Sequence, residues 1–212
     1  MIKTIKINRR IALSGIFAFI FFPNQSFSDQ KVLDNLIQPQ VIGSSDAPIK
    51  IKEYFSLTCG HCASFHKKTL PKLQKKYIDK GQVQLEFIDY PLDRLALVAA
   101  ALARSLPTKE GYVEAIKILL NKQKQWAYSD KPLDELFSIA KLFGISSKKF
   151  DDIIKNTPLM QEIINVMEKE SKNFDIVSTP TFIINNEHKI SGALSFKEFE
   201  KELLTLIKSQ NS

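Results

Sequence analysis

Apolar and polar residues alternate along two short stretches of the chain, which is the pattern of strands that bury one face. In the first stretch, Ile49 and Phe55 share a face with one carboxylate, Glu53. The alternation predicts strands over residues 49–55 and 83–88, and two further short strands are predicted over residues 181–185 and 188–191. Only Asn186 and Glu187 separate the last two strands, which predicts a tight hairpin.

Between these strands, apolar residues recur at helical spacing. We predict a helix from Cys59 to about residue 80, kinked at Pro71, and a last helix that begins with a capping box of Ser195 and Glu198. After the second strand, the spacing predicts helices over residues 95–105, 112–124 and 133–143, a short helix from residue 146, and a helix that includes residues 159–167.

The resulting order is β-α-β, then a block of helices, then β-β-α. This order predicts an α/β protein in which a helical domain is inserted between two halves of a sheet domain. We place the sheet domain at residues 49–91 and 175–212, and the inserted helical domain at residues 92–174. Residues 29–48 are a mixed N-terminal segment that ends in a loop.

The first 28 residues have the three parts of a secretory signal peptide. Four basic residues precede an apolar run over residues 11–22, Pro23 breaks that run, and small residues at Ser26 and Ser28 suit a signal peptidase. The run is shorter than the roughly 20 residues that span a bilayer. We therefore predict cleavage after Ser28 and export to the periplasm, with an uncleaved anchor as the alternative.

The charge balance argues against a nucleic-acid partner. The formal net charge is +7, but four of the 30 basic residues and none of the 23 acidic residues lie in residues 1–28, which leaves +3 for the remainder. Such a mild excess gives little support to phosphate binding. With two cysteines, the chain also cannot be a disulfide scaffold.

Those two cysteines form the motif Cys59-Gly60-His61-Cys62, placed where a strand passes into a helix. A C-x-x-C pair at such a junction is a redox signature. Unpaired N–H groups at a helix N-terminus stabilise an anion, so the pKa of Cys59 should be lowered. A protonated His61 would stabilise the thiolate further, and Cys62 would resolve mixed disulfides from one turn deeper.

Two stretches give the chain a resemblance to a known family. Residues 53–62, from Glu53 to Cys62, resemble the active-site stretch of the DsbA family of periplasmic thiol:disulfide oxidoreductases in the thioredoxin superfamily, and residues 177–182 resemble its cis-proline loop. The resemblance covers about residues 40–208 and implies a thioredoxin-like fold with an inserted helical domain. The pair Gly60-His61 departs from the Pro-His of the best-known members and is found in protein disulfide isomerases.

The resemblance implies a redox disulfide between Cys59 and Cys62, with no cofactor. The substrates would be unfolded or reduced exported proteins, and a quinone-linked, DsbB-like membrane partner would reoxidise the pair. It also implies a cis bond before Pro180, with main-chain groups of Thr179 free to pair with a substrate peptide. A proline that merely begins a strand is the alternative.

Two other side chains have competing interpretations. Glu53 matches the family's buried glutamate and would accept a proton from Cys62; the alternative is a solvated residue at a strand end. Cys59, Cys62 and His66 share a helix face and could form a three-ligand zinc set, but no fourth ligand is evident besides His188. We predict no metal site, and we expect His66 to be a surface or groove residue.

The leading hypothesis is therefore a dithiol oxidase. A disulfide isomerase or reductase is the alternative within the enzyme class, and a non-enzymatic C-x-x-C protein that binds metal or holds peptides is the alternative outside it. Periplasmic isomerases of similar fold use a separate N-terminal dimerisation domain, and residues 29–48 are too few for one. We accordingly expect a monomer whose helical block forms a groove for unfolded substrate.

Overall fold

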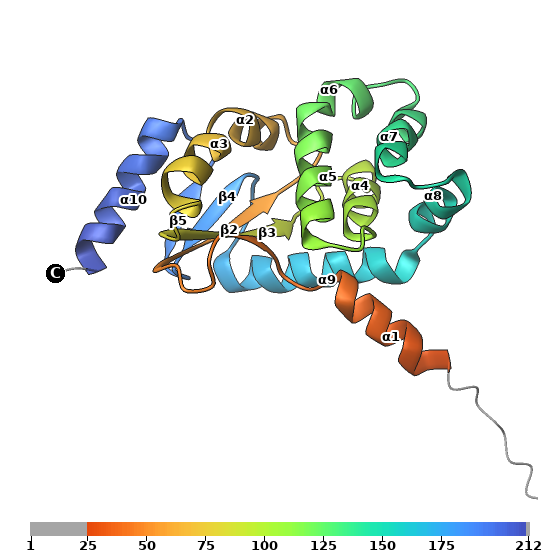
Figure 1. Cartoon of the computed structure of the whole chain (residues 1–212), viewed down its shortest axis with the longest axis horizontal. Helices are drawn as coiled ribbons and strands as arrows, with labels where there is room; N and C mark the ends of the chain where they lie inside the picture. The colour runs from red at the N-terminus through yellow and green to blue at the C-terminus, as the bar shows by residue number, and fades with distance from the viewer. Residues whose placement is uncertain (1–24, 211–212) are drawn as a thin grey trace, which may run out of the picture.

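A five-stranded mixed sheet forms the centre of the computed structural model, which describes residues 25–210 (Figure 1). The strand order is β1-β3-β2-β4-β5, and only β2 and β3 run parallel. The strands are β1 (Gln40–Ile42), β2 (Ile49–Phe55), β3 (Val83–Asp89), β4 (Thr181–Ile184) and β5 (His188–Ser191). The last four of these lie where the sequence predicts strands.

The N-terminal segment has more structure than its sequence indicates. It contains the helix α1 (Gln25–Leu36) and the edge strand β1, which pairs antiparallel with β3. Three residues are too few for an alternating pattern to show. The predicted cleavage point after Ser28 falls within α1, and residues 1–24 lie outside the described residues. Across residues 25–210, none of the helices combines the length and apolar character needed to span a membrane.

The helix predicted between β2 and β3 is divided into three parts. These are α2 (Gly60–Lys68), α3 (Leu70–Leu73) and the π-helical η1 (Gln74–Ile78). Pro71 lies in the first turn of α3, where its missing N–H does least harm. Gly81 follows with a φ of 69°, a left-handed conformation that ends the helical segment at little cost for glycine.

The helical block between β3 and β4 confirms the predicted insertion. Its helices are α4 (Arg94–Arg104), α5 (Lys109–Asn121), α6 (Gln123–Trp126), α7 (Pro132–Ala140), the 3₁₀ turn η2 (Lys141–Phe143), α8 (Ser147–Ile154) and α9 (Thr157–Phe174). The side chains of Asp93, Thr108, Ser146 and Asn156 cap four of these helices. The exact boundaries at residues 91/92 and 174/175 stay a prediction.

A buried ionic cluster joins this block to the sheet. Arg104 of α4 donates from Nε to Asp89 Oδ2 at 2.6 Å, and the Tyr112 hydroxyl of α5 donates to Asp89 Oδ1 at 3.1 Å. A second nitrogen of Arg104 reaches the carbonyls of Leu36 and Gln38, between α1 and β1. Helices α4 and α5 and the end of α1 are thus tied to the end of β3, and around them one apolar core runs from the sheet into the helices.

The C-terminal part confirms the remaining predictions. Asn185, Asn186 and Glu187 connect β4 to β5, one residue more than the predicted two-residue turn, and φ values of 51° and 59° give Asn185 and Asn186 the left-handed backbone of a tight hairpin. The last helix, α10 (Phe196–Gln210), begins with the predicted capping box. The Ser195 N–H donates to Glu198 Oε2 at 2.9 Å, and the Glu198 N–H donates back to Ser195 Oγ at 3.4 Å.

Candidate active site

Cys59 and Cys62 lie at the junction of β2 and α2, as the sequence predicts. Cys59 is the N-cap residue of α2, with extended backbone angles (φ −80°, ψ 117°), and its side chain is partly exposed. Cys62 lies in the first helical turn and is fully buried. Both are free thiols, so the structure presents the reduced form of the pair.

The pKa of Cys59 is lowered to about 5 from its ordinary value of 9.0. The largest cause is the Cys62 side chain, whose S–H donates a hydrogen bond to the Cys59 thiolate. Partial burial opposes the effect, while the Thr179 side chain and the backbone N–H groups of Cys62 and His61 reinforce it. The helix N-terminus therefore contributes, as the sequence predicts, but the second thiol contributes more.

The pKa of Cys62 is shifted strongly upward. Burial is the main cause, followed by the hydrogen bond and the charge of Cys59, and then by the negative charge of Glu53. The two sulfurs are therefore unequal at neutral pH. Cys59 is a half-exposed thiolate, whereas Cys62 is a buried thiol.

The peptide bond between Thr179 and Pro180 is cis, as predicted. It brings the Thr179 carbonyl within 3.3 Å of Cys59 Sγ, which donates to it. The carbonyl is therefore engaged by Cys59 when that thiol is protonated, whereas the resemblance implies a Thr179 main chain that is free to pair with a substrate. The buried Thr179 hydroxyl has no partner within residues 25–210 when Cys59 is protonated, so it can donate to the thiolate.

Glu53 is fully buried in the middle of β2, where its strand neighbours are Phe87 of β3 and Phe182 of β4. His66 was predicted to be a surface or groove residue; it does line a cavity, but it is not a surface residue, because its side chain is buried and paired with Glu53. Nε2 of His66 lies 3.0 Å and 3.2 Å from the two carboxylate oxygens of Glu53. One signal could have indicated the contact: His66 follows the buried Cys62 by four residues and so shares its helix face.

The side chain of His61 is exposed, and within the described chain no hydrogen bond or ion pair joins it to Cys59. Its backbone N–H acts on Cys59 instead. Sequence reasoning missed Gln123 of α6, whose buried amide donates to the carbonyls of Leu57 at 2.8 Å and Cys59 at 3.0 Å. A lone glutamine on a helix gives no sequence signal for such a contact.

Nothing in residues 25–210 forms a cluster of three His, Cys, Asp or Glu side chains suited to a metal ion. The zinc alternative of Cys59, Cys62 and His66 is not assembled, because Nε2 of His66 faces Glu53. A cavity of about 630 Å³ lies between α2 and the α5–α6 region. Its lining includes Gly60 of the motif, Lys67 and Tyr128 but neither cysteine, so the helical block forms a hollow that reaches the motif at Gly60.

The sequence matches the Thioredoxin family over residues 35–204. A Rickettsia conorii protein named as a protein-disulfide oxidoreductase is 32% identical over 155 residues, 73% of this chain and 55% of that protein. Disulfide bond formation protein D of Bacillus subtilis is 27% identical over 69% of this chain and 68% of its own length. The chain spans about half the length of the Rickettsia relatives it matches.

Among solved structures, alpha-DsbA1 of Wolbachia pipientis is similar in both sequence and fold. Its TM-score is 0.74 at 30% identity, and the match covers 82% of this chain and 92% of that one. DsbA of Chlamydia trachomatis shares the fold, with a TM-score of 0.70 at 21% identity over 81% of this chain and 92% of that one.

Proposed function

The chain belongs to the thioredoxin superfamily and is DsbA-like within it, and from that premise we propose that it is an enzyme that introduces disulfide bonds into other proteins. The observation that carries the proposal is the inequality of the two sulfurs. Cys59 is accessible with a pKa of about 5, while Cys62 is buried with a raised pKa. A pair arranged in this way can be attacked at one sulfur and release the other.

In the proposed reaction, a substrate thiolate attacks Sγ of Cys59 in the Cys59–Cys62 disulfide. The bond between the two cysteines breaks, Cys62 leaves with the electron pair and takes up a proton, and a mixed disulfide joins Cys59 to the substrate. A second substrate thiolate then attacks the substrate sulfur of that bond and releases Cys59 as a thiolate. Two electrons pass from the substrate to the cysteine pair, and the substrate gains a disulfide.

Thr179 and Pro180 would bind the substrate beside Cys59. In the disulfide and in the mixed disulfide, Cys59 carries no S–H, so the hydrogen bond to the Thr179 carbonyl at 3.3 Å is lost. That carbonyl is then available to a backbone N–H of an extended substrate. We assign Glu53 the role of proton partner to Cys62, since its charge acts on that thiol from a fully buried position.

Oxidase activity is favoured over isomerase or reductase activity by the state of Cys59. A thiolate held at a pKa of about 5 stabilises the reduced pair, which makes the disulfide a stronger oxidant. The Gly60-His61 pair is the feature that favours an isomerase, and that activity is the second candidate. A non-enzymatic C-x-x-C protein that binds metal or holds peptides is the candidate outside the enzyme class.

We further propose that the chain is exported and acts on exported proteins. The N-terminal sequence supports export. Reoxidation of the cysteine pair would fall to a quinone-linked, DsbB-like membrane protein. We also expect a monomer, since β1 of the N-terminal segment completes the edge of the sheet instead of contributing to a separate domain.

Trapping of mixed disulfides tests the proposal in the native compartment. Cys62→Ala should accumulate mixed disulfides with exported proteins, because the resolving thiol is missing, whereas Cys59→Ala should accumulate none. Alkylation of the free thiols followed by non-reducing gels would show the difference. The opposite pattern would reverse the roles of the two cysteines, and the same pattern in both variants would contradict the exchange mechanism.

A second assay separates oxidase from isomerase activity. The oxidised protein should refold a reduced substrate faster than the reduced protein repairs a scrambled one, and light scattering should give the mass of a monomer. A stable dimer with strong repair of the scrambled substrate would favour the isomerase.

A further inference from the structure

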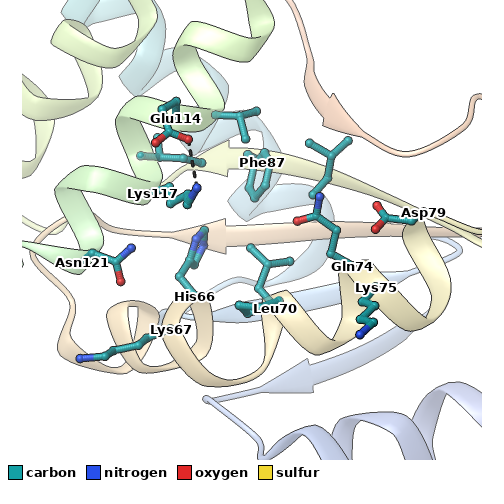
Figure 2. A pocket seen from close by; sticks show the side chains of 14 residues that line it. His66, Lys67, Leu70, Gln74, Lys75, Asp79, Phe87, Glu114, Lys117 and Asn121 are labelled. Carbon is teal, nitrogen blue, oxygen red and sulfur yellow. Dashed lines mark hydrogen bonds and ion pairs between the residues drawn. The ribbon is translucent and has the colours of Figure 1, made fainter. Parts of the chain in front are cut away.

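A cavity of about 440 Å³ lies between the α2–α3–η1 segment and α5, on the face of α2 that turns toward the sheet (Figure 2). His66 of α2, Leu70 of α3 and Phe87 of β3 line its inner part. Its rim is made of exposed polar side chains: Lys67, Gln74, Lys75, Asp79, Glu114 and Lys117. The inner wall of the cavity can therefore be reached by water.

His66 is in contact with this cavity and with the buried carboxylate at the same time. Nε2 lies 3.0 Å from Oε1 of Glu53, and only 4% of the His66 side chain and none of the Glu53 side chain is exposed. The imidazole ring lies against three aromatic rings, those of Phe55, Phe65 and Phe87. Among the described residues, its other nitrogen, Nδ1, has no hydrogen-bond partner.

The charges near the His66–Glu53 pair are few. On β2, the group that faces the imidazole is Glu53 itself, and on β3 it is the apolar Phe87. Helix α5 contributes Tyr112, whose hydroxyl interacts with the charge of Glu53. The ions at the cavity rim come from α2, η1 and α5, and two of them, Glu114 and Lys117, pair with each other at 3.2 Å. His66 thus provides a polar connection from Glu53 to the water-accessible cavity.

We propose that His66 is a proton-transfer residue that connects Glu53 to water in this cavity, so that protons reach and leave Cys62 through Glu53 and His66. The inference rests on the proposed function in that Cys62 must gain a proton when its disulfide is reduced and lose it when the disulfide forms again. Cys62 and Glu53 are both fully buried, so neither exchanges protons with water directly.

The proton balance of one reduction is simple. A substrate dithiol and the Cys59–Cys62 disulfide give a substrate disulfide, a Cys59 thiolate, a Cys62 thiol and one proton released to water. The proton that Cys62 gains passes from Nε2 of His66 to the carboxylate of Glu53, and from Glu53 to Cys62. Nδ1 of the same ring then takes a proton from cavity water. Nε2 therefore exchanges protons with Glu53 and Nδ1 with water, and the ring does not need to rotate.

The test uses dithiothreitol as the reductant, so that it does not depend on the biological substrate. The rate at which dithiothreitol reduces the disulfide is followed by acid quenching, alkylation and mass spectrometry between pH 5 and pH 9. His66→Gln keeps a hydrogen-bonding group near Glu53 but cannot carry a proton. It should slow the reaction about tenfold or more and alter the pH profile, within the range of general acid–base effects.

The matched control is His188→Gln. His188 also pairs with a glutamate, Glu202 at 3.2 Å, but on the exposed surface, and this variant should keep the wild-type rate and pH profile. A His66→Gln protein that is folded by circular dichroism and reacts within about twofold of the wild-type rate at every pH would overturn the proposal.

Chemical rescue distinguishes proton transfer from a structural role. His66→Ala leaves a space that joins the 440 Å³ cavity, and free imidazole should enter it and restore much of the lost rate in a saturable way, with no effect on the wild type. A folded His66→Ala protein that is slow and insensitive to imidazole would overturn the proposal. If His66→Ala does not fold, the pH profile of His66→Gln decides. Failure of the wild type to oxidise a peptide would contradict only the proposed function, since the dithiothreitol assay stands apart from it.

Discussion

The pKa of Cys59 depends mainly on Cys62. This dependence can be tested by removing the S–H group of Cys62. In the structure, the Cys62 S–H is the largest contributor to the low pKa of Cys59, ahead of the Thr179 side chain and the backbone N–H groups of α2. Cys62→Ala removes the donor and leaves the helix N-terminus intact. Cys62→Ser is the matched control, because its hydroxyl can still donate to the thiolate.

The magnitude follows from the energy of such a bond. A hydrogen bond to a charged group contributes about 1.5–3 kcal/mol, and one pKa unit corresponds to about 1.36 kcal/mol. Loss of the donor should therefore raise the pKa of Cys59 from about 5 to between about 6 and 7 in Cys62→Ala. Cys62→Ser should remain closer to the wild type.

The assay is the ultraviolet absorbance of the thiolate, followed against pH in the reduced protein, with Cys59→Ala as the blank. Equal pKa values in the wild type and in Cys62→Ala would refute this explanation of the low pKa. So would an increase in Cys62→Ser as large as the increase in Cys62→Ala.

Three further predictions concern stability and the site. The pKa of Cys59 is about 5 in the folded protein and 9.0 ordinarily, so the Cys59 thiolate stabilises the folded reduced protein. This stabilisation is complete above about pH 9 and is lost as the pH falls through 5. For this half-exposed group the stabilisation should amount to about 1–2 kcal/mol at pH 7, measured by urea unfolding of the reduced wild type and Cys59→Ala. Arg104→Met leaves Asp89 buried without its ion partner and should lower the free energy of unfolding by about 3–5 kcal/mol in the same assay. The control Lys148→Met removes an exposed ion pair and should lower it by less than about 1 kcal/mol. Thr179→Val removes the buried hydroxyl that can donate to the thiolate, so it should raise the pKa of Cys59, and an unchanged absorbance titration would contradict that role.

The sequence predicted the elements that have a clear period or flank a recognisable turn. Strands β2 and β3 were found because their apolar residues alternate, and β4 and β5 because they flank a predicted tight hairpin. Strand β1 has three residues and no period, so it could not be found from its own sequence. The predicted helix over residues 112–124 ends earlier, at Asn121, and α6 follows after Lys122, a local change of direction for which no proline or glycine gives a signal.

The site was predictable as far as its chemistry is local. Cys59 and Cys62 are defined by the motif, and the burial of Glu53 follows from its place on the apolar face of a strand. The contacts that depend on packing between elements were not predictable. His66 looked like a polar residue on a helix surface, and its burial becomes evident only when α2 is packed against β2.

The most direct test of the proposed function is the transfer of one disulfide. Oxidised protein is mixed at pH 7 with an equal amount of a reduced peptide that contains two cysteines, and all free thiols are alkylated and counted by mass spectrometry. We expect the peptide to gain a disulfide and to lose two alkylatable thiols. Cys59 and Cys62 should become alkylated to the same extent. A peptide that stays reduced beside an intact Cys59–Cys62 disulfide would contradict the account.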